Sequence, residues 1–247
     1  MIRNLILTLA TSCLLLVAVP SYGKIRVGVT SFPPFYTVDA SGKAGGILLE
    51  IMLRTLESAG IEYEVEVFPP KRLYTNLGMG KTDLFLGLQG SPIYHDHVIY
   101  SEKHITYLSL RVYANADTPL PASKEELSGH VLGTIRGYSY GGFIRYIKDP
   151  RNNIIEKPML DHMSSFLMLK NKRIEYLLNY KHPSDQVLSS LYYPGLKFTE
   201  FMNANVHFIV SKATPEAVLL MKTLETTYQR LKEAGEFATI RSDDTAN

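Results

Sequence analysis

Cysteine and tryptophan are the residues that this sequence most lacks: its 247 residues include one cysteine, Cys13, and no tryptophan. A single cysteine cannot form a disulfide within the chain, so the hydrophobic core alone must stabilise the fold. Runs of basic residues are absent too, and the net charge is only +2. Proteins that bind nucleic acid usually carry a basic patch or stripe, so nucleic acid is not an expected partner.

One long apolar run is present, at the N-terminus. It covers residues 5–19, follows Arg3 and is followed by small residues before Lys24. These features predict a secretory signal peptide over residues 1–23. An uncleaved membrane anchor is the less favoured alternative, because a bilayer span needs ~20 residues. Cys13 lies inside the run, which makes it a poor lipidation site. Export into a bacterial periplasm agrees with the lack of disulfides.

Strand-like and helix-like segments alternate through the rest of the chain. Apolar or alternating runs predict strands, and apolar residues at helical spacing predict helices. The first unit is predicted as strand 24–30, helix 45–60, strand 61–67, helix 70–80 and strand 82–88. The pattern then restarts with strand 105–114, a strand, glycine turn and helix within 129–147, strand 153–157, helix 161–171, strand 173–180, helix 184–191, strand 205–212 and helix 215–235.

This alternation predicts an α/β fold with two lobes, each a mostly parallel sheet flanked by helices. Open parallel sheets bind ligands at the carboxyl ends of their strands. Two such lobes facing one another would form a cleft between them, which is a common place for a small-molecule site.

The segment "SFPPFY" (31–36) directly follows the first predicted strand. Two prolines leave this elbow few conformations, so it could present an aromatic face at the cleft at little entropic cost. For Phe35 we favour a place in the core. For Phe32, both a cleft wall and a core position stay open, since aromatic side chains bury large areas anywhere.

Five segments, taken in order, resemble the extracellular solute-binding proteins of family 3, the polar amino-acid binders of ABC importers. They are "VGVTSFPPFYTVDASGKAGGILLEIM", "LYTNLGMGKTDLFLG", "YSEKHITYLSLRVYA", "ELSGHVLGTIRGYSY" and "LKNKRIEYLLNY". The resemblance implies a periplasmic binding protein-like II fold that closes around a small-molecule ligand. It also implies an ABC permease as partner; we expect a monomer without cofactor. The first lobe would hold residues 24–112 and 206–247, and the second would hold 113–205.

Both charged anchors of the amino-acid-binding relatives are missing from this sequence. The place of the arginine that pairs with the ligand carboxylate falls on Tyr94, and the place of the aspartate that holds the ammonium group falls on Tyr180. We therefore expect a small polar or aromatic solute rather than a standard α-amino acid.

Other expected ligand contacts follow the ends of predicted strands. The resemblance assigns carbonyls and hydroxyls to the segment 89–91. Free N–H groups at the turn 136–140 favour an anion or a carbonyl oxygen, although Ser139 could simply be an N-cap. Arg72 could supply a charge to the ligand or pair with a neighbouring carboxylate. The expected contacts are Phe32, Arg72, Gln89, Gly90, Ser91, Tyr94, Arg136, Tyr138, Ser139, Tyr140 and Tyr180.

Three histidines, His95, His97 and His104, raise the alternative of a metal site. Residues two apart share a face only in an extended chain, and no cysteine pattern accompanies them. We favour a solvated loop and expect no metal.

Two further functions remain open beside transport. Similar folds include cyclohexadienyl dehydratases, and here Glu175 would be the nearest acid or base. A sensory binding protein would also read its ligand by closing, and the sequence does not separate it from a transport protein.

Overall fold

The computed structural model describes residues 23–238 of the chain. The predicted signal peptide therefore lies outside the described residues, apart from Gly23. No helix within the described range combines the length and the apolar character needed to cross a membrane.

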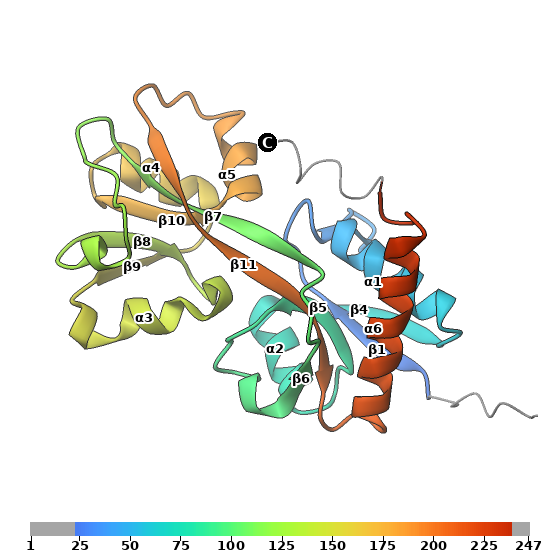
Figure 1. The fold of residues 1–247 in the computed structure, drawn as a ribbon. Coiled ribbons are helices and arrows are strands. Elements are labelled where there is room, and N and C mark those ends of the chain that lie inside the picture. The colour runs from blue at the N-terminus through green and yellow to red at the C-terminus, as the bar shows by residue number, and fades with distance from the viewer. Residues whose placement is uncertain (1–22, 239–247) are drawn as a thin grey trace, which may run out of the picture.

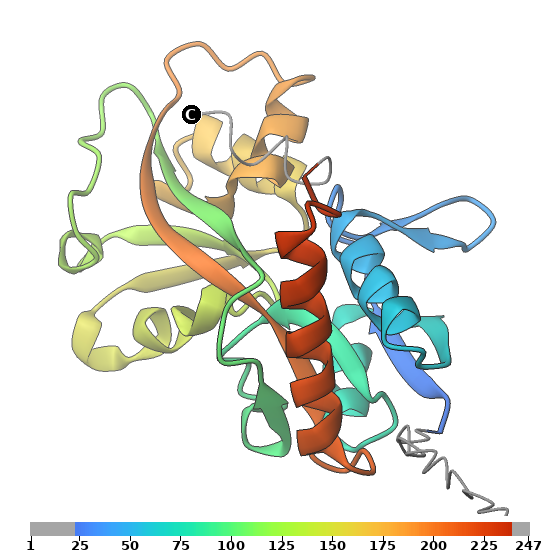
Figure 2. The same ribbon diagram turned by 45° about the vertical axis from the view of Figure 1, so that its right-hand side comes forward.

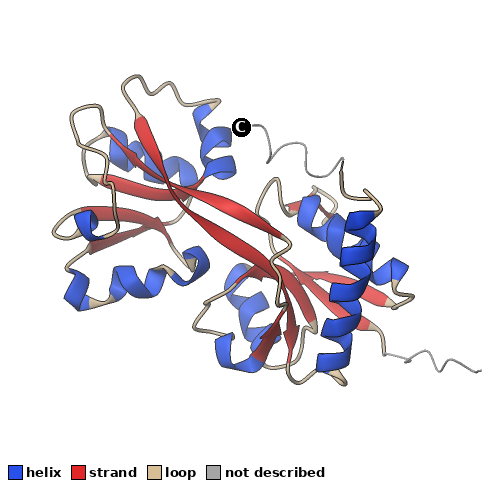
Figure 3. Ribbon diagram, in the orientation of Figure 1, coloured by secondary structure: helices blue, strands red, loops and turns tan. Residues whose placement is uncertain are grey.

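Strands and helices alternate along the chain much as predicted (Figures 1 and 3). The strands are β1 (Ile25–Val29), β2 (Thr37–Val38), β3 (Ala44–Gly45), β4 (Tyr63–Val67), β5 (Leu84–Leu88), β6 (Val98–Tyr100), β7 (Thr106–Ala114), β8 (Val131–Ile135), β9 (Ile155–Met159), β10 (Tyr176–Tyr180) and β11 (Lys197–Ser211). The α-helices are α1 (Ile47–Ser58), α2 (Pro70–Gly78), α3 (Ile144–Lys148), α4 (His162–Lys170), α5 (Lys181–Leu188) and α6 (Ala217–Glu233).

The molecule has two lobes, and one continuous sheet path runs through both (Figures 1 and 2). The strand order is β4-β1-β5-β11-β7-β10-β8-β9, with β6 paired to β11 off this path. Within the first lobe β4, β1 and β5 are parallel, and within the second β10, β8 and β9 are parallel. The predicted two-lobed α/β fold is confirmed.

Two antiparallel strands, β7 and β11, join the lobes. Residues 197–206 of β11 pair with β7, whereas 206–210 pair with β5 of the first lobe. β11 therefore changes partner at Val206. The expected lobe limits at 112/113 and 205/206 fall within these two strands and stay a prediction.

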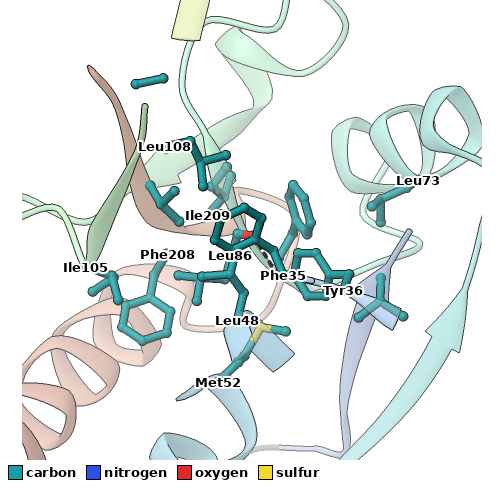
Figure 4. Close-up of a cluster of buried hydrophobic side chains, with 14 of the residues drawn as sticks. Phe35, Tyr36, Leu48, Met52, Leu73, Leu86, Ile105, Leu108, Phe208 and Ile209 are labelled. Carbon is teal, nitrogen blue, oxygen red and sulfur yellow. Dashed lines mark hydrogen bonds between the residues drawn. The ribbon is translucent and has the colours of Figure 1, made fainter. Parts of the chain in front are cut away.

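The core of the first lobe lies between its sheet and the helices α1 and α6 (Figure 4). Phe35 and Tyr36, which end the elbow, pack there beside Leu48, Met52 and Leu86. Fully burying an aliphatic or aromatic side chain stabilises the fold by about 1.5–3 kcal/mol. Phe35 is 1% exposed, which agrees with the core position favoured for it.

An ion pair with a buried carboxylate links three parts of the first lobe. The Asp83 carboxylate, which precedes β5 and is 5% exposed, accepts hydrogen bonds from the backbone N–H and the side chain of Arg26 in β1. Thr214, which precedes α6, donates to the same carboxylate at 2.8 Å. Burial alone would raise the pKa of Asp83, but these hydrogen bonds outweigh it and hold that pKa below its usual value.

Several boundaries differ from the prediction. β11 begins at Lys197 rather than near 205. Its first half is not predicted because it pairs only with β7 and exposes both polar and apolar side chains, Phe198 among them. α5 begins at Lys181 rather than at 184, with Pro183 in its first turn, where the missing N–H costs little. The short strands β2, β3 and β6 carry no periodicity that a sequence pattern could detect.

Candidate functional site

The elbow after β1 places Phe32 against the second lobe. Phe32 and Tyr36 exchange two backbone hydrogen bonds of 2.9 Å, which close the loop around the two prolines. The Phe32 ring is half-buried, and its centroid lies 5.7 Å from that of Tyr138 and 5.5 Å from that of Tyr180. Both contacts are edge-to-face, the geometry that aromatic quadrupoles favour. Phe32 is therefore a contact between the lobes.

A small cavity lies behind this contact. Its volume is ≈ 60 Å³. We call it the aromatic cavity. It is lined by Phe32, Tyr36, Leu48, Tyr74, Phe85, Leu86, Gly87, Leu88, Leu108, Tyr138, Ser139, Tyr180 and Val206. Both lobes contribute to this wall, and none of its side chains carries a charge.

The aromatic cavity is too small for a ring in this conformation. An apolar cavity of about 150 Å³ holds one benzene molecule, whereas this cavity measures ≈ 60 Å³. Four aromatic side chains, those of Phe32, Tyr74, Tyr138 and Tyr180, line it from the two lobes. A ring-bearing ligand that binds with the lobes closed would need these side chains to move.

Two tyrosine hydroxyls donate hydrogen bonds to backbone carbonyl groups of β5. Tyr36 donates to the carbonyl oxygen of Leu86 at 2.5 Å, and Tyr94 donates to that of Leu88 at 2.7 Å. Tyr94 is 1% exposed. Tyr94 therefore does not line the cavity, and each of these two carbonyls already accepts one hydroxyl proton.

Two other hydroxyls are free. Those of Tyr74 and Tyr180, which line the aromatic cavity from opposite lobes, have no hydrogen-bond partner within residues 23–238. Burial raises the pKa of Tyr74 to about 12 and raises that of Tyr180 well above its usual value. Both phenols are therefore neutral donors at physiological pH, suited to an acceptor atom on an uncharged part of a ligand.

Tyr138 is fixed by a hydrogen-bonded chain that leads into the second lobe. The Asn179 side-chain oxygen accepts the N–H of Tyr180 and contacts Nδ1 of His162 at 3.0 Å. An oxygen acceptor there requires the proton on Nδ1, so Nε2 accepts from the Tyr138 hydroxyl at 3.2 Å. Burial lowers the pKa of His162, which keeps the ring neutral and the Tyr138 ring in place.

A second, larger opening also borders the 138–139 turn. Its volume is ≈ 580 Å³. We call it the basic groove. It is lined by Ser91, Pro92 and Ile93 of the first lobe and by Ile135, Arg136, Gly137, Tyr138, Ser139, Ile144, Arg145, Lys148, Asp149, Glu156 and Pro158 of the second. Tyr138 and Ser139 line both openings, so the basic groove adjoins the aromatic cavity.

The lobes also touch backbone to backbone. Gly90, with φ +83°, follows β5, and Gly142, with φ +94°, precedes α3. A Cβ on Gly90 would lie 2.6 Å from the Cα of Gly142. Only glycine permits this approach in these backbone conformations.

The remaining expected site residues line neither the aromatic cavity nor the basic groove. Tyr140 is buried, and its ring stacks on Tyr180 while its hydroxyl bonds within the second lobe. Gln89 is half-buried and Arg72 is exposed on α2; neither lines the cavity or the groove. Glu175 is exposed and paired with His130. His95 and His97 lie in one short helix turn, and within residues 23–238 no group of three or more His, Cys, Asp or Glu side chains could hold a metal ion.

Sequence reasoning missed several lining residues. Tyr74 and Phe85 lie within a helix and a strand, where an aromatic residue usually indicates core packing. Arg145 belongs to a segment predicted only as a helix. No local sequence signal distinguishes these positions, because the cavity and groove arise from how the two lobes meet.

The sequence matches the family of bacterial extracellular solute-binding proteins, family 3, over residues 25–243. The chain belongs to this family. This confirms the resemblance seen in its sequence. No curated protein sequence matches the chain significantly.

Solved structures show the same fold at low sequence identity. A histidine kinase sensor domain with similarity to periplasmic binding proteins has a TM-score of 0.72 at 17% identity, over 92% of this chain and 97% of its own. An ancestral arginine-binding protein bound to arginine has a TM-score of 0.70 at 19% identity, over 92% of this chain and 100% of its own. The substrate-binding protein of an amino acid ABC transporter has a TM-score of 0.66 at 18% identity, over 91% and 100%.

Proposed function

We propose that this protein is a periplasmic solute-binding protein that captures a small polar or aromatic solute between its lobes and delivers it to an ABC importer. The observation that carries the proposal is the aromatic cavity, which both lobes build and no charged side chain lines. Membership of the solute-binding family supports the role in transport. Binding would favour the closed state, because the solute contacts both lobes only when they are closed.

The walls of the cavity argue against a standard α-amino acid. A zwitterion brings an ammonium and a carboxylate group, and burying either without a partner is costly. Tyrosine occupies both positions at which relatives carry charged anchors, and the carbonyls of Leu86 and Leu88 are engaged by Tyr36 and Tyr94. The part of the solute that enters this cavity is therefore uncharged, with an acceptor atom facing Tyr74 or Tyr180.

A ring-dehydrating enzyme has less support. Such a reaction needs an acid or base within reach of the substrate. Glu175, the nearest candidate in the sequence, is exposed and engaged by His130, and no ionisable carboxyl or imidazole group lines the aromatic cavity.

A thermal-shift screen of the purified mature chain tests the proposal. The panel contains the standard α-amino acids, amines, organic acids and uncharged aromatic compounds. A solute at about 100 times its Kd should raise the Tm by about 5–10 °C. We expect such a shift from a ring-bearing compound and little from any α-amino acid. A shift of that size with a standard α-amino acid alone would refute the proposed ligand class.

Replacing Phe32 with alanine should weaken binding of the ring-bearing solute found in this screen by about tenfold, since edge-to-face contacts contribute about 0.5–1.5 kcal/mol each. Isothermal titration calorimetry measures the change. Tyr192, which is 83% exposed, provides the control: Tyr192→Ala should bind as the wild type does. Equal affinities for Phe32→Ala and Tyr192→Ala would place the solute elsewhere.

A further inference from the structure

The basic groove contains two arginines that no acid neutralises. Arg136 and Arg145 are exposed at its surface, and neither forms an ion pair within residues 23–238. Arg145 reaches from the second lobe toward the first: its Nη2 atom lies 3.3 Å from where a Cβ on Gly90 would be. One guanidinium therefore lies where the lobes meet.

The acids in the groove are already engaged. Asp149 is bound by the guanidinium of Arg151 at 2.5 Å. Glu156 accepts from the hydroxyl of Thr134 at 2.8 Å and lies 3.7 Å from the ammonium of Lys148. The surplus charge of the groove is therefore positive, and it belongs to Arg136 and Arg145.

Neutral donors accompany these charges. Ser91 of the first lobe accepts the N–H of Ile93 at 3.4 Å, which leaves its own hydroxyl proton free to donate. The Ser139 hydroxyl has no partner within the described residues. Guanidinium groups bind carboxylate and phosphate through paired N–H donors, and hydroxyl donors can complete the coordination of such an anion.

We propose that the basic groove is an anion subsite for the solute that occupies the aromatic cavity, so that the solute is a ring compound carrying a carboxylate or phosphate group. The inference rests on the proposed function. Tyr138 and Ser139 line both openings, so one molecule can place its ring in the cavity and its oxyanion in the groove. Because Ser91 and Arg145 belong to different lobes, the anion also holds the lobes together.

Two probes with the same ring test this subsite: 4-hydroxyphenylacetate and its amide, 4-hydroxyphenylacetamide. Isothermal titration of the wild type should give about tenfold tighter binding of the acid, as expected for charge-assisted hydrogen bonds. In the double variant Arg136→Gln/Arg145→Gln the two affinities should agree within about twofold. Arg173, exposed and outside the groove, provides the control: Arg173→Gln should keep the tenfold preference.

Inorganic phosphate tests the groove without a ring. At constant ionic strength it should raise the Tm of the wild type and of Arg173→Gln, and leave that of the double variant unchanged. If acid and amide bind the wild type equally and phosphate has no effect on its Tm, the proposed anion subsite is refuted, whereas the proposed binding of the ring in the aromatic cavity is not. If phosphate stabilises the wild type but neither ring compound binds, the groove is an anion site and the proposed ring specificity fails. If phosphate acts equally on the double variant, the arginines do not form the subsite.

Discussion

Replacing Gly90 with alanine is expected to weaken solute binding by about tenfold to hundredfold, because the overpacking cost of about 1–3 kcal/mol falls on the closed state alone. The new Cβ would lie 2.6 Å from the Cα and 3.0 Å from the N of Gly142 in the other lobe. The atoms of Gly142 that the new Cβ would meet belong to the backbone, which cannot rotate away as a flexible side chain could. Titration calorimetry measures the affinity, and small-angle scattering at saturating solute shows whether the lobes still close.

Two other glycines make matched comparisons. Gly42 has a φ of +85°, close to the +83° of Gly90, and no atom lies within 4 Å of its added Cβ. Gly42→Ala therefore carries the same backbone strain without the collision, and it should bind normally. A Cβ on Gly142 would meet Arg145 Nη2 at 3.4 Å. The affinity of Gly142→Ala for the solute should therefore lie between those of Gly90→Ala and Gly42→Ala. If Gly90→Ala and Gly42→Ala bind equally well, the Gly90–Gly142 approach does not form in the bound state.

Removing the Asp83 carboxylate is expected to lower the free energy of unfolding by about 1.5–3 kcal/mol, since Asp83→Ala removes the buried acceptor of several charge-assisted hydrogen bonds. The cost is limited because the Arg26 guanidinium is 37% exposed and keeps its hydrogen bond to the Gly80 carbonyl. Urea denaturation measures the loss. Asp117, exposed and paired with Lys172, is the control, and Asp117→Ala should cost less than about 1 kcal/mol. A loss at Asp83 no larger than at Asp117 would mean that the pair does not stabilise the first lobe.

The contribution of Asp83 should depend on pH. Its pKa is lowered in the folded protein, so the folded state binds this proton less readily than the unfolded state does. The stabilisation is therefore fully present above the unfolded value of about 4 and is lost as the pH falls through the folded pKa. Urea titrations at successive pH values should show the gap between wild type and Asp83→Ala narrowing below about pH 4. A gap that widens there would contradict the assignment.

The order of the elements and the family could be predicted from the sequence because their signals are local. The periodicity of "GGILLEIMLRTLESAG" predicts α1, and Pro70 begins α2 as predicted. The first half of β11 could not be found in this way. Residues 197–204 mix polar and apolar side chains without burying one face, because that segment pairs only with β7.

The candidate site is less accessible to sequence reasoning. Phe32 is marked by the proline elbow, and Tyr138 and Ser139 by a glycine turn. Tyr74 and Arg145 carry no such mark, since their importance depends on which surfaces of the two lobes meet. Tyr94 shows the converse: its place in the sequence aligns with a ligand anchor, yet its hydroxyl is bound to the Leu88 carbonyl and it does not line the cavity.

The partner change of β11 at Val206 has a consequence for how the chain folds. The antiparallel neighbour of β5 comes from residues 206–210, so Leu84 pairs with Val210, far along the chain. Contacts this distant in sequence slow folding because a long loop must close first. Until residues 206–210 have paired, this sheet edge at β5 stays bare, and we expect a folding intermediate that exposes it.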